Sequence, residues 1–164
     1  MWFLDTGYLI ALFSAKDTFH AQAVALQARA MQERRRLLTT DAVVFEVGAA
    51  FSRVTLRTAG AAIIHTLLSD PNIEVVAATA PQRDAAIELF TQHQDKDWSL
   101  CDCLSFTLMR ERRLDSALAA DHHFAQAGFV ALLLQTSWVL GLVYGQLEAP
   151  WSQQAPQDAQ CLVG

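Results

Sequence analysis

The sequence is poor in cysteine and, towards its end, in basic residues. It has three cysteines in 164 residues, Cys101, Cys103 and Cys161. They do not form a disulfide framework, which favours a reduced, cytoplasmic protein. No Lys or Arg follows Arg113, so residues 114–164 carry a net charge of −4, whereas residues 1–113 carry −1. Bulk charge therefore does not indicate a nucleic-acid-binding protein, and such binding would depend on local arginine clusters. The clusters are Arg29 with Arg34–Arg36, Arg53 with Arg57, and Arg110 with Arg112–Arg113.

Other signals are missing as well. No charged and apolar leader precedes Trp2, so we expect no export, and the apolar stretch 131–147 is interrupted too often to span a membrane. There is no glycine-rich phosphate loop and no nucleophile elbow. The second aspartate of an aspartyl-phosphate phosphatase is replaced by Gly7. Cys101 and Cys103 are too close for a zinc knuckle, and His122 and His123 are expected to point in different directions on a helix.

Short apolar segments alternate with longer amphipathic ones, which predicts βα units on a parallel sheet. The composition, 52% hydrophobic and 18% charged, is sufficient for the core of one domain, which we expect over residues 1–134. The predicted strands are Trp2–Asp5, Leu37–Thr40, Ile73–Ala77, Ser116–Ala119 and Phe129–Leu134. Helices are predicted for 18–32 and 81–92, after the second strand, and after Ser99.

Residues 135–164 are predicted to be an extension of this domain. Its apolar part, Trp138–Tyr144, is expected to cover this domain or a second subunit. From Glu148 onward the sequence has two prolines and four glutamines without periodicity, and we expect it to be weakly ordered.

Four acidic residues in apolar surroundings are the main functional signal: Asp5, Glu46, Asp102 and Asp121. Each is predicted to lie where a strand passes into a loop or helix, and the carboxyl ends of parallel strands meet in one crevice. Each aspartate alone could be a helix cap, and Ser99-x-x-Asp102 has the spacing of a capping box. Glu46 has no such explanation, because Val43, Val44, Phe45 and Val47 surround it.

Taken together, the four acids predict a cation site. Two carboxylates about 5 Å apart repel by roughly 3 kcal/mol at an effective dielectric constant of about 20. A cluster of this kind requires protonation or a bound divalent ion. Hard oxygen ligands suit Mg²⁺ or Mn²⁺, ions that bind phosphates and activate water, and the predicted chemistry is phosphodiester hydrolysis.

Four segments resemble PIN-domain ribonucleases, in particular the VapC-like toxins of prokaryotic toxin–antitoxin pairs. They are Phe3–Ala11, Thr39–Glu46, Asp97–Phe106 and Ala120–Phe124, and the resemblance runs from Trp2 to about Leu134. The block around Trp98-Ser99-Leu100 and Asp102 is the most specific part. The family often has a hydroxyl residue directly before the third acid and two residues before the fourth, where this chain has Cys101 and Ala119.

The resemblance implies a PIN-like three-layer α/β/α sandwich with a five-stranded parallel sheet. It also implies a Mg²⁺-dependent endoribonuclease in which Asp5, Glu46, Asp102 and Asp121 are catalytic and bind the metal (Mg²⁺ or Mn²⁺). Thr6 is expected to orient ligands, and Ser99 either to orient ligands or, as we favour, to cap the following helix. The implied partners are an RNA substrate, held by arginine clusters around the acidic cleft, a cognate antitoxin and a second copy of the chain. The alternative is a catalytically silent PIN-like module that binds RNA or protein through the same cleft.

Overall fold

Five short parallel strands form the centre of the fold in this computed structural model, which describes residues 1–135. The order in the sheet is β3-β2-β1-β4-β5. Strands β2 and β3 are therefore added on one side of β1, and β4 and β5 on the other side. The strands are β1 (Trp2–Leu4), β2 (Leu37–Thr40), β3 (Ile73–Val76), β4 (Ser116–Leu118) and β5 (Val130–Ala131). The crossover leaves a topological switch point between β1 and β4.

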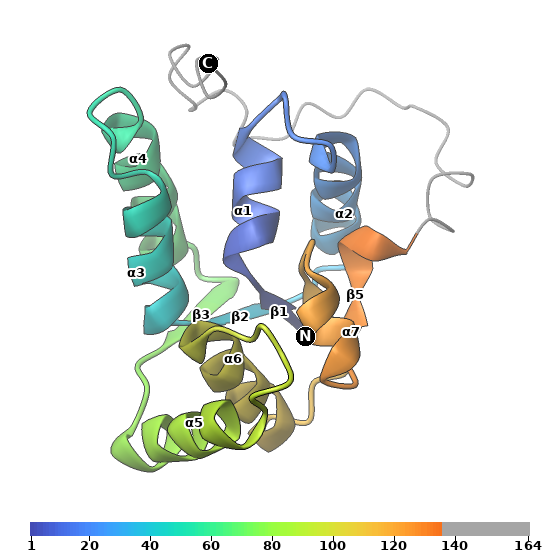
Figure 1. Cartoon of the computed structure of the whole chain (residues 1–164). Helices are drawn as coiled ribbons and strands as arrows, with labels where there is room; N and C mark the ends of the chain where they lie inside the picture. The colour runs from blue at the N-terminus through green and yellow to red at the C-terminus, as the bar shows by residue number, and fades with distance from the viewer. Residues whose placement is uncertain (136–164) are drawn as a thin grey trace.

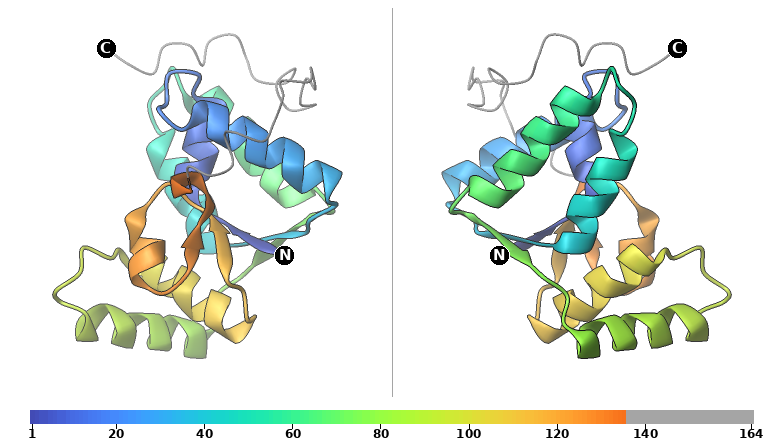
Figure 2. Two further views of the ribbon diagram at one scale, coloured as in Figure 1. Left: turned by 90° about the vertical axis from the view of Figure 1, so that its right-hand side faces the viewer. Right: turned by 90° about the vertical axis from the view of Figure 1, so that its left-hand side faces the viewer.

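Helices cover both faces of the sheet, which gives the predicted three-layer α/β/α architecture. They are α1 (Thr6–Phe13), α2 (His20–Gln32), α3 (Asp41–Ala50), α4 (Arg57–Ser69), α5 (Ala80–Gln92), α6 (Leu100–Glu111) and the short α7 (His122–Gln126). The first four lie on one side of the sheet, and α5, α6 and α7 lie on the other (Figure 1). Helix α6 lies between the sheet and α5 (Figure 2), and accordingly α6 buries six side chains whereas α5 buries only Ala86.

A chain of aromatic contacts fixes the elements next to the switch point. The ring of Phe106 on α6 lies 5.1 Å from the ring of Trp98 and 5.1 Å from that of Phe124 on α7, and Phe124 lies 6.1 Å from Phe3 on β1. Phe3, Phe106 and Phe124 have no exposed surface. Each such pair contributes about 0.5–1.5 kcal/mol beyond area burial. These rings stand within four residues of Asp5, Asp102 and Asp121, so the packing fixes the relative positions of the three backbones.

Most of the predicted elements are confirmed. The last strand is shorter than predicted, because after Ala131 the chain turns into a 3-10 helix (Leu132–Leu134) whose first two leucines are buried. Helix α4 was not predicted, although its buried residues Ala59, Ile63 and Leu67 follow helical spacing. None of the helices within residues 1–135 is long and apolar enough to cross a membrane. The predicted extension lies outside the described residues from 136 onward.

Two helical glycines differ in the space around them, and this difference is testable. A Cβ at Gly60 would lie 2.5 Å from the Cβ of Phe51, whereas at Gly48 the nearest atom, Ile64 Cδ1, would be 3.8 Å away. We expect Gly60→Ala to destabilise the protein by about 1–3 kcal/mol through overpacking. Gly48→Ala should stabilise it by about 0.5–1 kcal/mol, because alanine is the better helix former. Urea unfolding of both variants measures the difference, and equal effects would contradict the close contact of α3 and α4.

Candidate functional site

Asp5 follows β1 and begins α1. Its backbone N–H donates to the carbonyl of Leu118 on β4 at 3.1 Å, which places it at the switch point. The carboxylate is 7% exposed and accepts a hydrogen bond from the backbone N–H of Gly7 at 2.9 Å. Gly7 leaves room for it, because a Cβ there would lie 3.2 Å from Asp5 Oδ2. The prediction that Asp5 stands at a strand end is confirmed, and it caps α1 as well.

Glu46 reaches the same region from a helix. It is the sixth residue of α3, and the hydroxyl of Thr6 at the start of α1 donates to its Oε2. The prediction that Glu46 stands at a strand end is therefore wrong. Strand β2 ends at Thr40, whose hydroxyl caps α3, and the helix then carries Glu46 one and a half turns further. Helical geometry, not the end of a strand, brings this acid to Thr6.

Asp102 also comes from a helix, the first turn of α6, so its predicted place at a strand end is wrong too. The predicted capping box is confirmed. Ser99 N–H donates to Asp102 Oδ2 at 2.8 Å, and Asp102 N–H donates to Ser99 Oγ at 3.0 Å. No strand precedes α6, because the chain reaches it from α5 through the loop 93–99.

Asp121 lies after β4 and caps α7, as the strand-end prediction requires. Its Oδ1 accepts a hydrogen bond from the backbone N–H of His123 at 2.8 Å. The imidazole Nδ1 of His123 lies 3.0 Å from Asp121 Oδ2 and 3.4 Å from Asp102 Oδ2. His123 thus connects the third and fourth acids. The expectation that the two histidines diverge is wrong, since their rings lie 4.6 Å apart and both Nδ1 atoms face Asp121.

Electrostatic effects show that the acids influence one another. Burial, followed by the negative charges of Asp102 and Glu46, raises the pKa of Asp5 to about 7. Burial and the neighbouring Glu46, Asp5 and Asp102 also raise the pKa of the Cys101 thiol, so this cysteine lies among three of the acids as a neutral thiol. The donor set is rich in carboxylate oxygen and short of cations, which fits a divalent metal ion.

Sequence reasoning missed the part played by His123 in this centre. The signal was present in Asp121-His122-His123, but the spacing of adjacent residues on a helix argued against it. At the first turn the cap residue Asp121 is not itself helical, with φ −102° and ψ 135°, and its carboxylate turns back toward both rings. A contact between a cap and its own first turn depends on side-chain rotamers, which helical periodicity does not describe.

The arginine clusters do not surround the acids. Arg36 directly precedes β2 and Arg113 lies shortly before β4, whereas Asp5 and Asp121 follow strands, so in a parallel sheet they lie at opposite edges. Arg112 is ten residues beyond Asp102 and ends the same helix, a distance of about 15 Å along its axis. The prediction that Arg34–Arg36 and Arg112–Arg113 flank the acidic cleft is therefore wrong.

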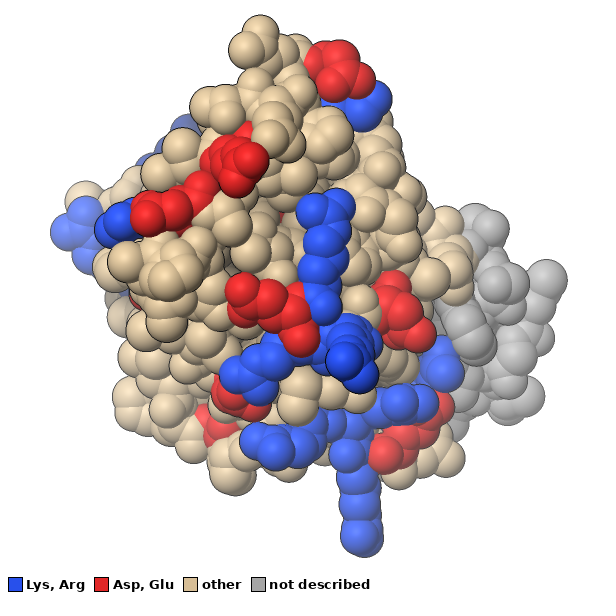
Figure 3. All heavy atoms as spheres, turned by 90° about the horizontal axis from the view of Figure 1, so that it is seen from below, with Lys and Arg blue, Asp and Glu red and all other residues tan. Residues whose placement is uncertain are grey.

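The two clusters are instead neighbours of each other. Glu74 on β3 pairs with Arg112 at 2.8 Å and lies 4.0 Å from Arg36. Figure 3 shows Lys and Arg side chains gathered in one region of the underside, with Asp and Glu among them. A shallow hollow lined by Met1, Glu33 and Arg34–Arg36 lies in the same part of the fold.

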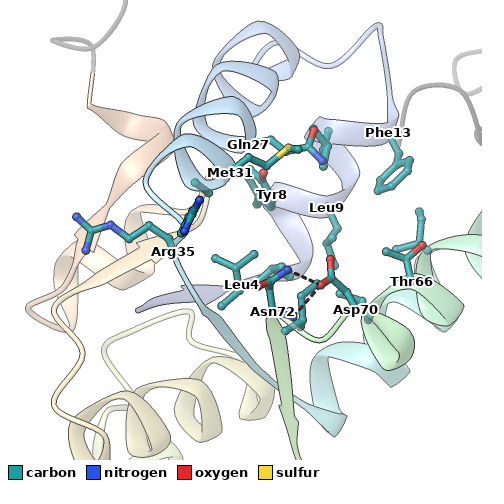
Figure 4. A pocket seen from close by; sticks show the side chains of 17 residues that line it. Leu4, Tyr8, Leu9, Phe13, Gln27, Met31, Arg35, Thr66, Asp70 and Asn72 are labelled. Atoms are coloured by element: carbon teal, nitrogen blue, oxygen red, sulfur yellow. Dashed lines mark hydrogen bonds between the residues drawn. The ribbon is translucent and has the colours of Figure 1, made fainter. Parts of the chain in front are cut away.

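An apolar pocket lies between α1, α2 and α4. Tyr8, Leu9 and Phe13 line it from α1, Met31 from α2 and Thr66 from α4, while Asn72 and Asp70 are hydrogen-bonded to each other at its rim (Figure 4). None of the four acids lines it. An apolar pocket is a common place for an active site, but the walls of this one carry no group of titratable or metal-binding side chains comparable to the acids. The acidic centre is therefore the candidate functional site.

The comparisons agree with this geometry. The family model described as "PIN domain" matches residues 2–130, and the chain belongs to the PIN-domain family. It is 31% identical over 130 residues to the "23S rRNA-specific endonuclease VapC20" of two Mycobacterium tuberculosis strains, covering 79% of this chain and 96% of the relative.

The fold agrees with that of a solved relative. The crystal structure of M. tuberculosis VapC20, described as a sarcin-ricin loop cleaving toxin, superposes with a TM-score of 0.73 and 27% identity over 80% of this chain and 98% of the other. The chain is thus a homologue of a VapC-type endonuclease toxin, and the resemblance read from the sequence is confirmed.

The raised pKa of Asp5 has a consequence for stability. The folded protein binds this proton more tightly than the unfolded chain, so between the ordinary pKa of 3.8 and about 7 the native state holds the extra proton. Apo stability must then fall as pH rises through this window, by roughly 4 kcal/mol in total, and level off above it. Asp5→Asn should abolish most of the decline.

Chelator-treated wild type, Asp5→Asn and the exposed control Asp84→Asn can be compared by urea unfolding from pH 4 to 8. The control should retain the slope of the wild type. An unchanged slope in Asp5→Asn would show that Asp5 is not the titrating group.

Proposed function

We propose that the chain is an endoribonuclease that depends on a divalent ion, Mg²⁺ or Mn²⁺, and the toxin component of a toxin–antitoxin pair. The observation that carries this proposal is the packing of acids around Asp5: the hydroxyl of the next residue, Thr6, donates to Glu46, and the charges of Asp102 and Glu46 add to burial in raising the pKa of Asp5. Membership of the PIN-domain family and similarity to an endonuclease toxin support it. Retention of all four acids argues against the alternative of a silent binding module.

Asp5, Glu46, Asp102 and Asp121 are proposed to hold the divalent ion. When bound, such an ion lowers the pKa of a coordinated water and offsets charge on the scissile phosphate. The chain itself supplies rigidity: Gly7 N–H holds Asp5, the Thr6 hydroxyl holds Glu46, and Ser99 N–H holds Asp102. Ion binding must displace the proton that Asp5 retains near neutral pH, so Mg²⁺ affinity should increase with pH.

The partners follow from the same proposal. We propose an RNA substrate, a cognate antitoxin that inhibits the nuclease, and a homodimer that acts in the cytoplasm. The relative is named for 23S rRNA, which makes ribosomal RNA the first substrate to test.

Asp102→Asn should abolish Mg²⁺-dependent cleavage of RNA while the fold remains. The amide oxygen can still accept the hydrogen bond from Ser99 N–H at the capping position, but the ligand charge is lost. Ser99→Ala is the matched control, because it removes the other half of the capping box and leaves the carboxylate. We expect it to cost about 1 kcal/mol of stability and to retain cleavage.

The assay compares the purified wild type and both variants on total RNA and on 23S rRNA, with Mg²⁺ and with chelator. Cleavage by Asp102→Asn at the wild-type rate would refute the site. Binding of RNA without cleavage by the wild type would favour the silent module instead.

The neighbouring arginine clusters, Arg34–Arg36 and Arg112–Arg113, offer a second way to test RNA binding. Helices α2 and α6 end in the same way, with Arg34 and Arg113 in the left-handed region at φ 49° and 52°. Arg34 N–H donates to Met31 O and Arg35 N–H to Ala30 O, and Arg113 and Leu114 repeat this pattern. This is the Schellman motif, in which glycine is usual, and α7 does end with Gly128 at φ 92°. At each of these two positions, the left-handed conformation makes arginine less favourable than glycine by about 1 kcal/mol.

We expect the double variant Arg34→Gly with Arg113→Gly to be more stable than the wild type, because glycine relieves the backbone. If bound RNA extends from the acidic centre to the opposite edge of the sheet, this variant should also bind RNA more weakly, with a salt dependence reduced by about one unit of slope per lost phosphate contact. RNA titrations at several salt concentrations, together with urea unfolding, measure both effects. Higher stability with unchanged RNA affinity would show that these arginines form a solvated surface only.

A further inference from the structure

His123 is set among the acids by three features of the fold. It is the second residue of α7, Asp121 is the cap of that helix, and Asp102 is in the first turn of α6. The side chain of His123 is 13% exposed, close to that of Asp102 at 15%, and Asp121 is more open at 39%. The imidazole is thus enclosed on the protein side, while the carboxylate of Asp121 opens toward solvent.

The imidazole nitrogen that faces the acids has no hydrogen bond. Nδ1 of His123 is wholly buried, and although two carboxylate oxygens lie near it, neither meets the geometry of a hydrogen bond. A buried polar atom left without a partner costs about 1–3 kcal/mol. Buried polar atoms in native structures usually interact with a protein group, an ordered water or a bound ion. A metal ion would be such a partner for Nδ1.

The two separations measured from His123 Nδ1 fall in the range found between neighbouring ligands of one ion. Nδ1 of His123 lies 3.0 Å from Asp121 Oδ2 and 3.4 Å from Asp102 Oδ2. Two adjacent ligands at bond lengths of about 2.1 Å are separated by roughly 3.0 Å in an octahedron and 3.4 Å in a tetrahedron. A neutral imidazole with its proton on Nε2 presents a lone pair at Nδ1, as a ligand must.

We infer that Asp102, Asp121 and His123 form a mixed oxygen and nitrogen site that selects a first-row divalent transition ion such as Mn²⁺ over Mg²⁺. The inference rests on the proposed function, in which Asp102 and Asp121 hold the metal, and it adds the nitrogen ligand. Imidazole is a softer donor than carboxylate and favours transition ions, whereas Mg²⁺ prefers oxygen throughout. The ligand atoms of Asp121, His122 and His123 all lie within 4.8 Å of one another, but the inference leaves His122 out because its side chain is 69% exposed.

The test uses Mn²⁺ and Mg²⁺ as probes of the full chain. Calorimetry should give the wild type a dissociation constant at least tenfold lower for Mn²⁺ than for Mg²⁺. His123→Asn places an oxygen close to the position of Nδ1, so it should retain Mg²⁺ binding within about threefold and lose most of the preference for Mn²⁺. His122→Asn is the matched control, and it should leave both affinities unchanged.

Spin-echo spectroscopy of bound Mn²⁺ gives a readout that does not depend on activity, and its main result comes from the wild type alone. The wild type should show modulation from a directly bound ¹⁴N nucleus, and His123→Asn should not. Mn²⁺ bound without nitrogen coupling, but lost in Asp102→Asn, would overturn the histidine ligand and leave the acidic site intact. Mn²⁺ binding that Asp102→Asn does not weaken would overturn the acidic site and the inference together.

Discussion

The crowding of carboxylates at the switch point is the constraint to which the rest of this structure is adapted. Asp5 is buried beside Glu46 and Asp102, and like charges in a poorly solvated place repel strongly. The fold holds each acid by a hydrogen bond from its immediate surroundings: Gly7 for Asp5, Thr6 for Glu46, Ser99 for Asp102 and His123 for Asp121. Aromatic packing beneath them, centred on Phe106, stops the elements from moving apart.

Helix capping therefore leaves these acids able to take part in the proposed metal site. The sequence presents Asp5, Asp102 and Asp121 as possible caps, and the structure confirms all three. A cap uses a carboxylate oxygen to satisfy a backbone amide at a helix N-terminus, and the same bond fixes the direction of the carboxylate. Because a carboxylate has two oxygens and several acceptor positions, capping pre-organises these acids without using up their capacity to bind a cation.

Predictability from sequence differed between the parts of the site. The strands were predictable, because apolar runs such as Trp2–Leu4 and Ala117–Leu118 are buried on both faces of a parallel sheet. The resemblance to a known family identified the four acids. It did not show that Glu46 and Asp102 are carried by helices, and the orientation of those helices is set by tertiary packing. Strand-end logic applied only to Asp5 and Asp121. The arginines precede strands and the acids follow strands, so in a parallel sheet they lie at opposite edges. The sequence order contained this information, but using it requires the strand boundaries and the parallel topology.

The composition of the centre explains why His123 matters here. The family pattern has a hydroxyl directly before the third acid, and this chain has Cys101, whose raised pKa keeps it a neutral thiol among Glu46, Asp5 and Asp102. A thiol is a weaker hydrogen-bond donor than a hydroxyl, so the acids on this side are held less firmly. Ala119 likewise offers no hydroxyl near Asp121. The group that approaches both Asp102 and Asp121 is the imidazole of His123, at 3.4 Å and 3.0 Å. If His123 is a ligand as inferred, a centre that has Cys101 and Ala119 at these two positions and a nitrogen donor would discriminate among metal ions differently from one built from oxygen alone.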